Sequence, residues 1–329
     1  MRRLAGRLGN RALDILFLPG SQRFWKQRLL GKVMALLYHR VAPAGEHGFL
    51  SEGGAPTITP EEFQRDIRFL EDIGARFLSF SDLRRGDFPS SREFAVTITF
   101  DDGFRDSYER GLHYLDSRRI PATVFQSSAM LGDGRLVAEH ALYWHASQSG
   151  SCSDLIGFAR ARGWVGAEGE NPRTMVGRWL QEVPAAQLDE LLLTLEPRME
   201  DQAALARALY PAPELLRRAK KAGHEIGSHG HGHYHRETLG ALEFEADVRT
   251  SIARLGDVLG QAPTSFSYPF NARVEGDQET CSKYFQQIAT VDAQLIDRDC
   301  NPLALPRFTW PGQARNGLRH RRWLLTGRI

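Results

Sequence analysis

Apolar and polar positions along the chain follow two periodicities in turn. Short apolar runs indicate buried strands, and between them lie longer segments in which apolar residues recur every three or four positions, as in helices. The runs that predict strands are Val33–Tyr38, Phe77–Phe80, Ala95–Phe100, Ala122–Phe125, His224–Ser228, Ser265–Phe270, Ile288–Val291 and Arg307–Trp310. Because strands and helices alternate, the pattern favours a parallel α/β architecture.

Two helices are predicted with defined ends. One begins after Thr59, where Pro60 suits the first helical position and Glu62 completes a capping box. Its apolar face comprises Phe63, Ile67 and Leu70. The other runs from about Glu243 to Leu259, with apolar residues aligned along one face.

One region departs from this alternation. Between about Leu131 and Tyr210 there is no strand pattern, only helix-like stretches such as Ala185–Leu195. We interpret residues 131–210 as a helical insertion on an α/β barrel. It could shape a substrate cleft or simply cover core surface, and the sequence leaves both roles open.

Composition places the chain among soluble globular proteins. Its 329 residues suffice for one large single-core fold or for two ordinary domains. Hydrophobic residues make up 42% and charged residues 25%, which argues against global disorder. The net charge of +2 provides no global field for nucleic acid, so we predict no nucleic-acid partner. Three cysteines are too few for a disulfide framework, and their odd number favours a reducing compartment.

Both ends of the chain are basic. Residues 1–40 hold nine Lys and Arg residues with Asp14 as the single acid, and no acid follows Asp299. Residues 1–30 could form a basic amphipathic segment that contacts an anionic membrane face, although Pro19 would interrupt a helix there. A basic tail or a transit peptide are the alternatives. Charges interrupt the apolar stretch that a signal peptide needs. We therefore expect a cytoplasmic protein, peripheral to the inner face of the membrane, with a second basic tail at 313–329.

Two adjacent acids follow a buried strand. The run Ala95–Phe100 leads directly into Asp101, Asp102 and Gly103. Two carboxylates at the end of a buried strand are costly unless a metal or a basic partner compensates them. In α/β barrels the carboxyl ends of the strands form the active-site face. The alternative is that Asp102 caps a helix that starts near Phe104.

Four histidines alternate with other residues at 229, 231, 233 and 235, which is a metal-like density. A helical register would pair His229 with His233, or His231 with His235, whereas a strand register would group all four. A nonspecific chelating patch is the remaining alternative.

Together these two places resemble the polysaccharide deacetylase family, also called the NodB-homology domain or carbohydrate esterase family 4. Its first motif resembles Thr99-Phe-Asp-Asp-Gly103, and its second resembles Gly227-Ser-His-Gly-His-Gly-His233, with the lead-in Lys221–Ser228. Later segments resemble Phe266-Ser-Tyr-Pro-Phe270, Ile288–Asp292 and Leu305-Pro-Arg307. The resemblance covers about residues 33–310 except the insertion. It implies a distorted (β/α)7-type barrel over residues 31–312.

The order of the parts resembles a permuted subgroup of this family. Most members carry a catalytic His near the end of the domain, but nothing after Trp310 is similar to that motif. Instead, Leu36-Leu-Tyr-His-Arg-Val41 resembles the opening strand of the subgroup that includes exopolysaccharide deacetylases. That resemblance makes His39 the general acid. The alternative is a buried strand histidine with a structural hydrogen bond.

The resemblance also implies the remaining roles. Asp102, His229 and His233 would bind one divalent metal, with zinc expected and nickel, cobalt or iron able to use the same ligands. Asp101 would be the catalytic base. Many members have an arginine in the third motif that pairs with this base, but here Ser267 stands there, and Arg307 could replace the arginine across the barrel. Asn271 stands where glycine commonly follows the motif.

These features predict a metal-dependent hydrolase that removes an N-acetyl group from an amino sugar. The substrate would be a polysaccharide, an oligosaccharide or a lipid-linked glycan precursor. One alternative is a deformylase, or another amidase, of a lipid-linked amino sugar. The other is a non-catalytic glycan-binding or scaffold protein with a vestigial site, against which the intact set of acids and histidines argues.

Overall fold

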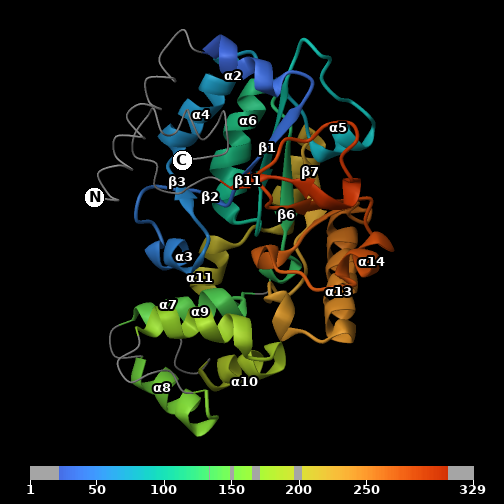
Figure 1. Ribbon diagram of the computed structural model, residues 1–329. Helices are drawn as coiled ribbons and strands as arrows, with labels where there is room; N and C mark the ends of the chain where they lie inside the picture. The colour runs from blue at the N-terminus through green and yellow to red at the C-terminus, as the bar shows by residue number, and fades with distance from the viewer. Residues whose placement is uncertain (1–21, 133, 149–151, 165–170, 196–201, 310–329) are drawn as a thin grey trace, which may run out of the picture.

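The computed structural model describes residues 22–132, 134–148, 152–164, 171–195 and 202–309 (Figure 1). Residues 1–21 of the predicted membrane-contact segment and the whole predicted tail at 313–329 lie outside the described residues, as does Trp310. The domain boundaries expected at residues 30 and 312 therefore stay predictions. Among the described residues, no helix is long and apolar enough to cross a membrane.

A nine-stranded parallel sheet curls into a nearly closed barrel. The strand order is β10-β9-β8-β7-β6-β5-β1-β11, and β4 pairs with β5 beside this path. The strands are β1 (Val33–Tyr38), β4 (Arg76–Phe77), β5 (Ala95–Phe100), β6 (Ala122–Gln126), β7 (Glu225–Ser228), β8 (Ser265–Ser267), β9 (Gln287–Thr290), β10 (Leu305–Pro306) and β11 (Phe308–Thr309). Strands β10 and β11 end the path on opposite sides, yet only Arg307 separates them in the chain. This residue consequently lies at the seam of the barrel, and the predicted α/β barrel is confirmed.

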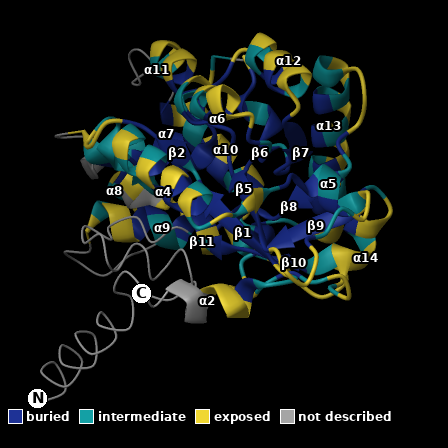
Figure 2. Cartoon of the chain, turned by 90° about the horizontal axis from the view of Figure 1, so that it is seen from above, coloured by how far each residue is buried: buried dark blue, intermediate teal, exposed yellow. Residues whose placement is uncertain are grey.

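Burial on both faces explains why the central strands are largely apolar. Every residue of β1 and β5 is buried, and Leu36 and Ile98 pair across the two strands. Figure 2 shows the buried strands in the middle of the molecule, with exposed residues on the outer faces of the surrounding helices.

The helices outside the insertion cover the barrel, with one exception. They are α2 (Gln22–Leu29), α3 (Gly48–Gly53), α4 (Pro60–Asp72), α5 (Phe80–Arg84), the π-helix η1 (Ser107–Leu112), α6 (His113–Arg118), α12 (Pro213–Ala222), α13 (Ala241–Leu259) and α14 (Asp277–Ser282). The exception is α3, which packs against the insertion. Helix α4 confirms the predicted capping box, because the Thr59 side chain accepts from the Glu62 amide and Glu62 accepts from the Thr59 amide. A separate two-stranded parallel sheet joins β2 (Arg40–Val41) to β3 (Thr57–Ile58).

Two predicted strands are shorter than expected because local turn chemistry ends them. The strand expected over Phe77–Phe80 stops at Phe77, since Ser79 forms a capping box with Asp82 and Phe80 begins α5. The strand expected over Ser265–Phe270 stops at Ser267, and a 3-10 turn, η5 (Pro269–Asn271), follows it.

Five of the described helices between β6 and β7 form the insertion, and they lie below the barrel in Figure 1. They are α7 (Ala138–Ser147), α8 (Cys152–Ala161), α9 (Pro172–Glu182), α10 (Ala185–Leu195) and α11 (Gln202–Leu209). They enclose an apolar cluster around the fully buried Trp179, and this cluster also includes Leu50 and Phe104 from the barrel side. The helices are therefore packed against the same end of the barrel that carries Asp101 and Asp102.

Candidate metal centre and active site

A tight turn brings both adjacent acids into one cavity. Asp101 and Asp102 follow β5 directly, and Asp102 has a left-handed backbone with φ 67°. Gly103 is also left-handed, and a Cβ there would lie 2.1 Å from Oε1 of Gln126. In an extended strand the two carboxylates would point to opposite faces. The turn removes that alternation, and only glycine fits its second position.

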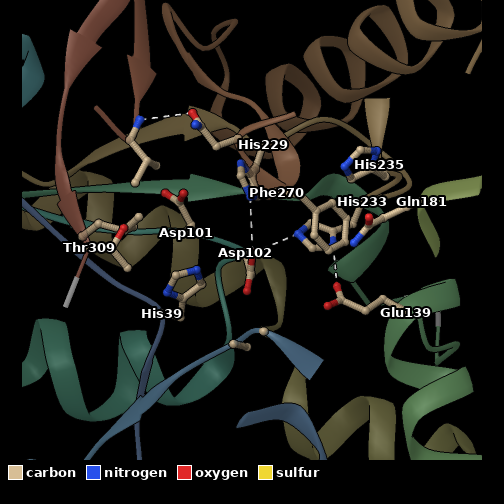
Figure 3. Close-up of a pocket in the computed structure, with 15 residues that line it drawn as sticks. His39, Asp101, Asp102, Glu139, Gln181, His229, His233, His235, Phe270 and Thr309 are labelled. Carbon is tan, nitrogen blue, oxygen red and sulfur yellow. Dashed lines mark hydrogen bonds and ion pairs between the residues drawn. The ribbon is translucent and has the colours of Figure 1, made fainter. Parts of the chain in front are cut away.

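Three buried side chains form a candidate metal centre (Figure 3). Oδ1 of Asp102 lies 3.3 Å from Nε2 of His229 and 3.0 Å from Nε2 of His233. One ligand atom from each residue lies within 4.8 Å of the other two. Because the Asp102 carboxylate contacts these imidazoles, the alternative that it caps a helix is wrong.

The histidine segment follows neither regular register. His229 comes directly after β7, and the chain then turns through left-handed backbone at Gly230 and His233. His231 points elsewhere, with Nδ1 2.8 Å from Oγ of Ser128. The grouping of all four histidines and the pairing of His231 with His235 are therefore wrong, whereas His229 and His233 do meet.

Contacts on the far side of each ring set the orientation of the candidate ligands. Nδ1 of His229 lies 2.8 Å from the carbonyl oxygen of Ser267, which can only accept, so the proton is on Nδ1. Nδ1 of His233 lies 2.8 Å from Oε2 of Glu139. An unprotonated Nδ1 would be repelled by that carboxylate, so the proton of this ring is on Nδ1 as well. Both rings thus present Nε2 to the centre. One carboxylate and two imidazoles, each backed by an acceptor, form a donor set that fits a divalent metal ion.

The charges of this cluster depend strongly on one another. Burial by itself raises the pKa of Asp102, but the neighbouring His233 and His229 hold it well below its usual value. Burial opposes a proton on His233, yet the carboxylates of Asp102 and Glu139 raise its pKa to about 10. The cluster without a metal therefore holds a proton that a cation would displace.

Asp101 is held by a buried arginine from the barrel seam. Arg307, with no exposed surface, donates from Nη1 to Oδ1 at 2.6 Å and from Nη2 to Oδ2 at 2.8 Å. Burial raises the pKa of Asp101, but this guanidinium, together with His229 and His39, outweighs burial and leaves the pKa below its ordinary value. Asp101 is therefore a carboxylate at neutral pH, which is the state that a general base needs.

His39 lies on the other side of the two acids from Glu139 (Figure 3). It follows β1 directly and is half-buried, and its Nδ1 has no hydrogen-bond partner among the described residues. That observation argues against a purely structural histidine. Burial lowers its pKa, although Asp102 and Asp101 oppose the shift. The ring can exchange a proton inside the cavity.

These groups line one cavity of about 410 Å³. His39, Asp101, Asp102, His229 and His233 all contribute to it. Phe270, which is 40% exposed, lies at its edge with its ring 4.9 Å from that of His233. A flat apolar ring beside the acids and imidazoles suits a ligand with both polar groups and an apolar face.

Comparison with known proteins decides the family. The family model described as polysaccharide deacetylase matches residues 89–283, which is more than half of the chain. The chain belongs to the polysaccharide deacetylase family. No curated protein sequence matches this deacetylase-family chain.

Solved structures share its fold. The deacetylase PplD of Streptococcus pyogenes, in complex with acetate, is 14% identical, with a TM-score of 0.57, over 90% of this chain and 99% of that one. IcaB from Ammonifex degensii is 16% identical, with a TM-score of 0.58, over 90% and 97%. The de-N-acetylase from Aggregatibacter actinomycetemcomitans is 13% identical, with a TM-score of 0.55, over 89% and 99%. At such identities the likeness concerns the fold alone.

Ser267 and Asn271, the two departures from the family pattern, both form hydrogen bonds at the site in this family member. Ser267 donates to Oδ2 of Asp101 at 3.2 Å and accepts from Nη2 of Arg307 at 2.7 Å, so it bridges the pair. Asn271 has a left-handed backbone, which asparagine tolerates better than most residues, and its Oδ1 accepts from the Val291 amide. Both departures thus occupy contacts that support the site.

Two cavity residues of the insertion were missed from sequence. Glu139 is on α7 and Gln181 is on α9, and both line the cavity. Glu139 carried one usable signal, because it is an acid next to His140 inside the mostly apolar stretch 136–144. Gln181 carried none that we can identify.

Proposed function

We propose that this chain is a metal-dependent hydrolase that removes the N-acetyl group of an amino sugar. The substrate would be a polysaccharide, an oligosaccharide or a lipid-linked glycan precursor. The observation that carries the proposal is the joint placement of a metal-binding donor set, an ionised carboxylate and a histidine around one cavity. Two of the similar folds belong to proteins named as a deacetylase and a de-N-acetylase, which supports the reaction class.

Asp102, His229 and His233 would hold the metal, for which zinc suits the ligand types and nickel, cobalt or iron are alternatives. When bound, such an ion polarises the acyl carbonyl and makes water a stronger nucleophile near neutral pH. Arg307 lies outside this donor set, since its guanidinium contacts Asp101.

The remaining side chains move protons. Asp101 accepts a proton from the attacking water, and Arg307 keeps it ionised and fixes its orientation. The water oxygen forms a bond to the acyl carbon, and the bond from that carbon to the sugar nitrogen breaks. An amide nitrogen leaves poorly without a proton, so His39 donates one to it. The products are acetate and the free amine.

Asparagine at position 101 tests this assignment. Asp101→Asn keeps the shape of the side chain but removes the base, so acetate release should fall by about 10²–10⁴-fold while bound metal stays at the wild-type stoichiometry. Asp87→Asn is a matched control, because Asp87 forms an exposed ion pair with Arg76 and neither residue lines the cavity. Loss of metal from the Asp101 variant, or retained turnover, would contradict the proposed role.

We also propose that residues 1–30 bring the enzyme to an anionic membrane face, which suits a cytoplasmic location beside the inner membrane. The basic residues of this segment support the proposal. Pelleting with anionic vesicles should carry down more of the full chain than of a chain lacking residues 1–30. Equal soluble fractions of the two would contradict membrane contact.

A further inference from the structure

Glu139 is a buried acid with an unusual set of neighbours. It begins the first turn of α7, in the helical insertion, and is 4% exposed. Within the described part of the chain, its ion-pair contacts are Nδ1 of His233 at 2.8 Å and Nε2 of His140 at 3.9 Å. No Lys or Arg is among them. Two imidazoles therefore surround a carboxylate that has lost most of its water.

Such a carboxylate is costly unless a cation compensates it. Two other buried acids of this protein contact guanidinium groups: Asp101 contacts Arg307, and Asp277 contacts Arg236. His140 does not supply a charge to Glu139, because burial lowers its pKa to about 3 and the ring is neutral. Of the two imidazole contacts of Glu139, the closer is Nδ1 of His233, at 2.8 Å. Well-packed apolar residues could stabilise the fold as much as this buried contact does, so stability alone does not explain the presence of Glu139.

We infer that Glu139 is a positioning residue of the metal centre, which holds His233 with its proton on Nδ1 and its Nε2 lone pair toward the cation. The inference rests on the proposed function, since it needs His233 to be a metal ligand. His229 receives the equivalent support from the Ser267 carbonyl of the barrel. His233 receives it from the insertion, so the inserted helices complete the centre as well as cover the barrel end.

Further contacts fix the helix turn from which Glu139 projects. The His140 ring stacks on Phe104, with centroids 5.1 Å apart, and Phe104 lies two residues after Asp102. The Tyr210 hydroxyl accepts from the Val137 amide at 3.1 Å and forms a hydrogen bond of 2.7 Å with Nδ1 of His140. The start of α7 is therefore fixed to the same turn that carries the carboxylate of Asp102. A residue that orients a metal ligand, as Glu139 would orient His233, needs such a rigid position.

Zinc affinity tests the inference. Glu139→Gln keeps the shape and removes the charge, so the zinc dissociation constant, measured by competition with a chromophoric chelator, should rise by about 10–100-fold. The melting temperature of the metal-free protein should stay close to the wild-type value. Glu182→Gln, at an exposed position of the same insertion that contacts Arg178, is the matched control and should bind zinc as the wild type does. Wild-type affinity in the Glu139 variant would overturn the inference.

His229→Ala separates this outcome from failure of the proposed function. If that variant still binds one zinc ion tightly, the metal centre itself is wrong, and the role of Glu139 is refuted with it. If it loses zinc while Glu139→Gln does not, only the inference about Glu139 fails. Nitrogen-15 spectra of zinc-loaded wild-type protein provide a test that needs no variant. They should show His233 protonated at Nδ1, and a proton on Nε2 instead would overturn the inference.

Discussion

Replacing Arg307 by methionine removes the charge beside Asp101 while keeping a long side chain at the barrel seam. The guanidinium donates to both carboxylate oxygens, at 2.6 and 2.8 Å, and its carbon lies 5.0 Å from the centroid of the Phe125 ring. Methionine can retain the contact with that ring, so the variant tests charge more than volume. Lysine would keep the charge but lose the two-pronged geometry, and we expect it to have an intermediate effect.

The size of the effect follows from the geometry of this pair. Two opposite charges about 4 Å apart attract by about 4 kcal/mol at an effective dielectric constant of about 20. One pKa unit corresponds to about 1.4 kcal/mol, so complete loss of the attraction would raise the pKa of Asp101 by about 3 units. The Ser267 hydroxyl still donates to Asp101 and offsets part of this loss. We therefore expect a rise of about 1–3 units.

The assay is acetate release against pH. Asp101 must be ionised to act as a base, so a raised pKa moves the acidic limb of kcat/KM to higher pH by about 1–3 units. Arg118→Met is the control, because Arg118 forms a surface pair with Glu71 that should contribute almost nothing. An acidic limb that does not move, in a variant with unchanged metal content, would refute the reasoning.

The same variant should change how stability depends on pH. In the wild type the folded pKa of Asp101 is depressed, so its contribution is present above the unfolded pKa of about 4 and is lost as pH falls through the folded value. Removing the guanidinium leaves a buried, unpaired carboxylate and should lower the free energy of unfolding near pH 7 by about 3–5 kcal/mol. The deficit should shrink at acidic pH, where Asp101 takes up a proton. Urea unfolding that shows a constant deficit would contradict this account.

Two further predictions concern catalysis and stability separately. His39→Gln should lower acetate release from an N-acetyl amino sugar by about 10²–10⁴-fold. It should affect hydrolysis of 4-nitrophenyl acetate far less, since that leaving group needs no proton; equal losses on both substrates would contradict the acid role. Thr59→Ala removes one half of the α4 capping box and should lower the free energy of unfolding by about 1 kcal/mol, measured in urea, without changing turnover. A wild-type unfolding curve would show that the cap contributes nothing.

Much of the barrel could be predicted from sequence because its central strands are buried on both faces. Such strands appear as continuous apolar runs, and the predicted bounds of β1 and β5 match the structure. Where an apolar run also contains a helix-capping residue, the hydrophobic pattern predicts a strand that is too long. Ser79 and Asp82 form a capping box that turns the end of one predicted strand into α5. The signal was in the sequence, but the apolar residue Phe80 concealed it.

The candidate site could be predicted only in part. The resemblance to the family motifs indicated which residues meet, although it could not indicate that left-handed backbone at Asp102 and His233 makes them meet. Glu139 lies 94 residues before His233 in the chain, and no motif connects the two. Its role depends on how the inserted helices pack, which local sequence patterns do not encode.

The most direct test of the account is acyl release from a panel of amino sugars. N-acetyl and N-formyl substrates would be offered in free, polymeric and lipid-linked form, with and without a metal chelator. The account predicts acetate release that the chelator abolishes and added zinc restores. Formate release instead would identify a deformylase. Release that is insensitive to the chelator, or no release from any substrate by protein that carries stoichiometric metal, would contradict the claim that this site is a metal-dependent N-deacetylase.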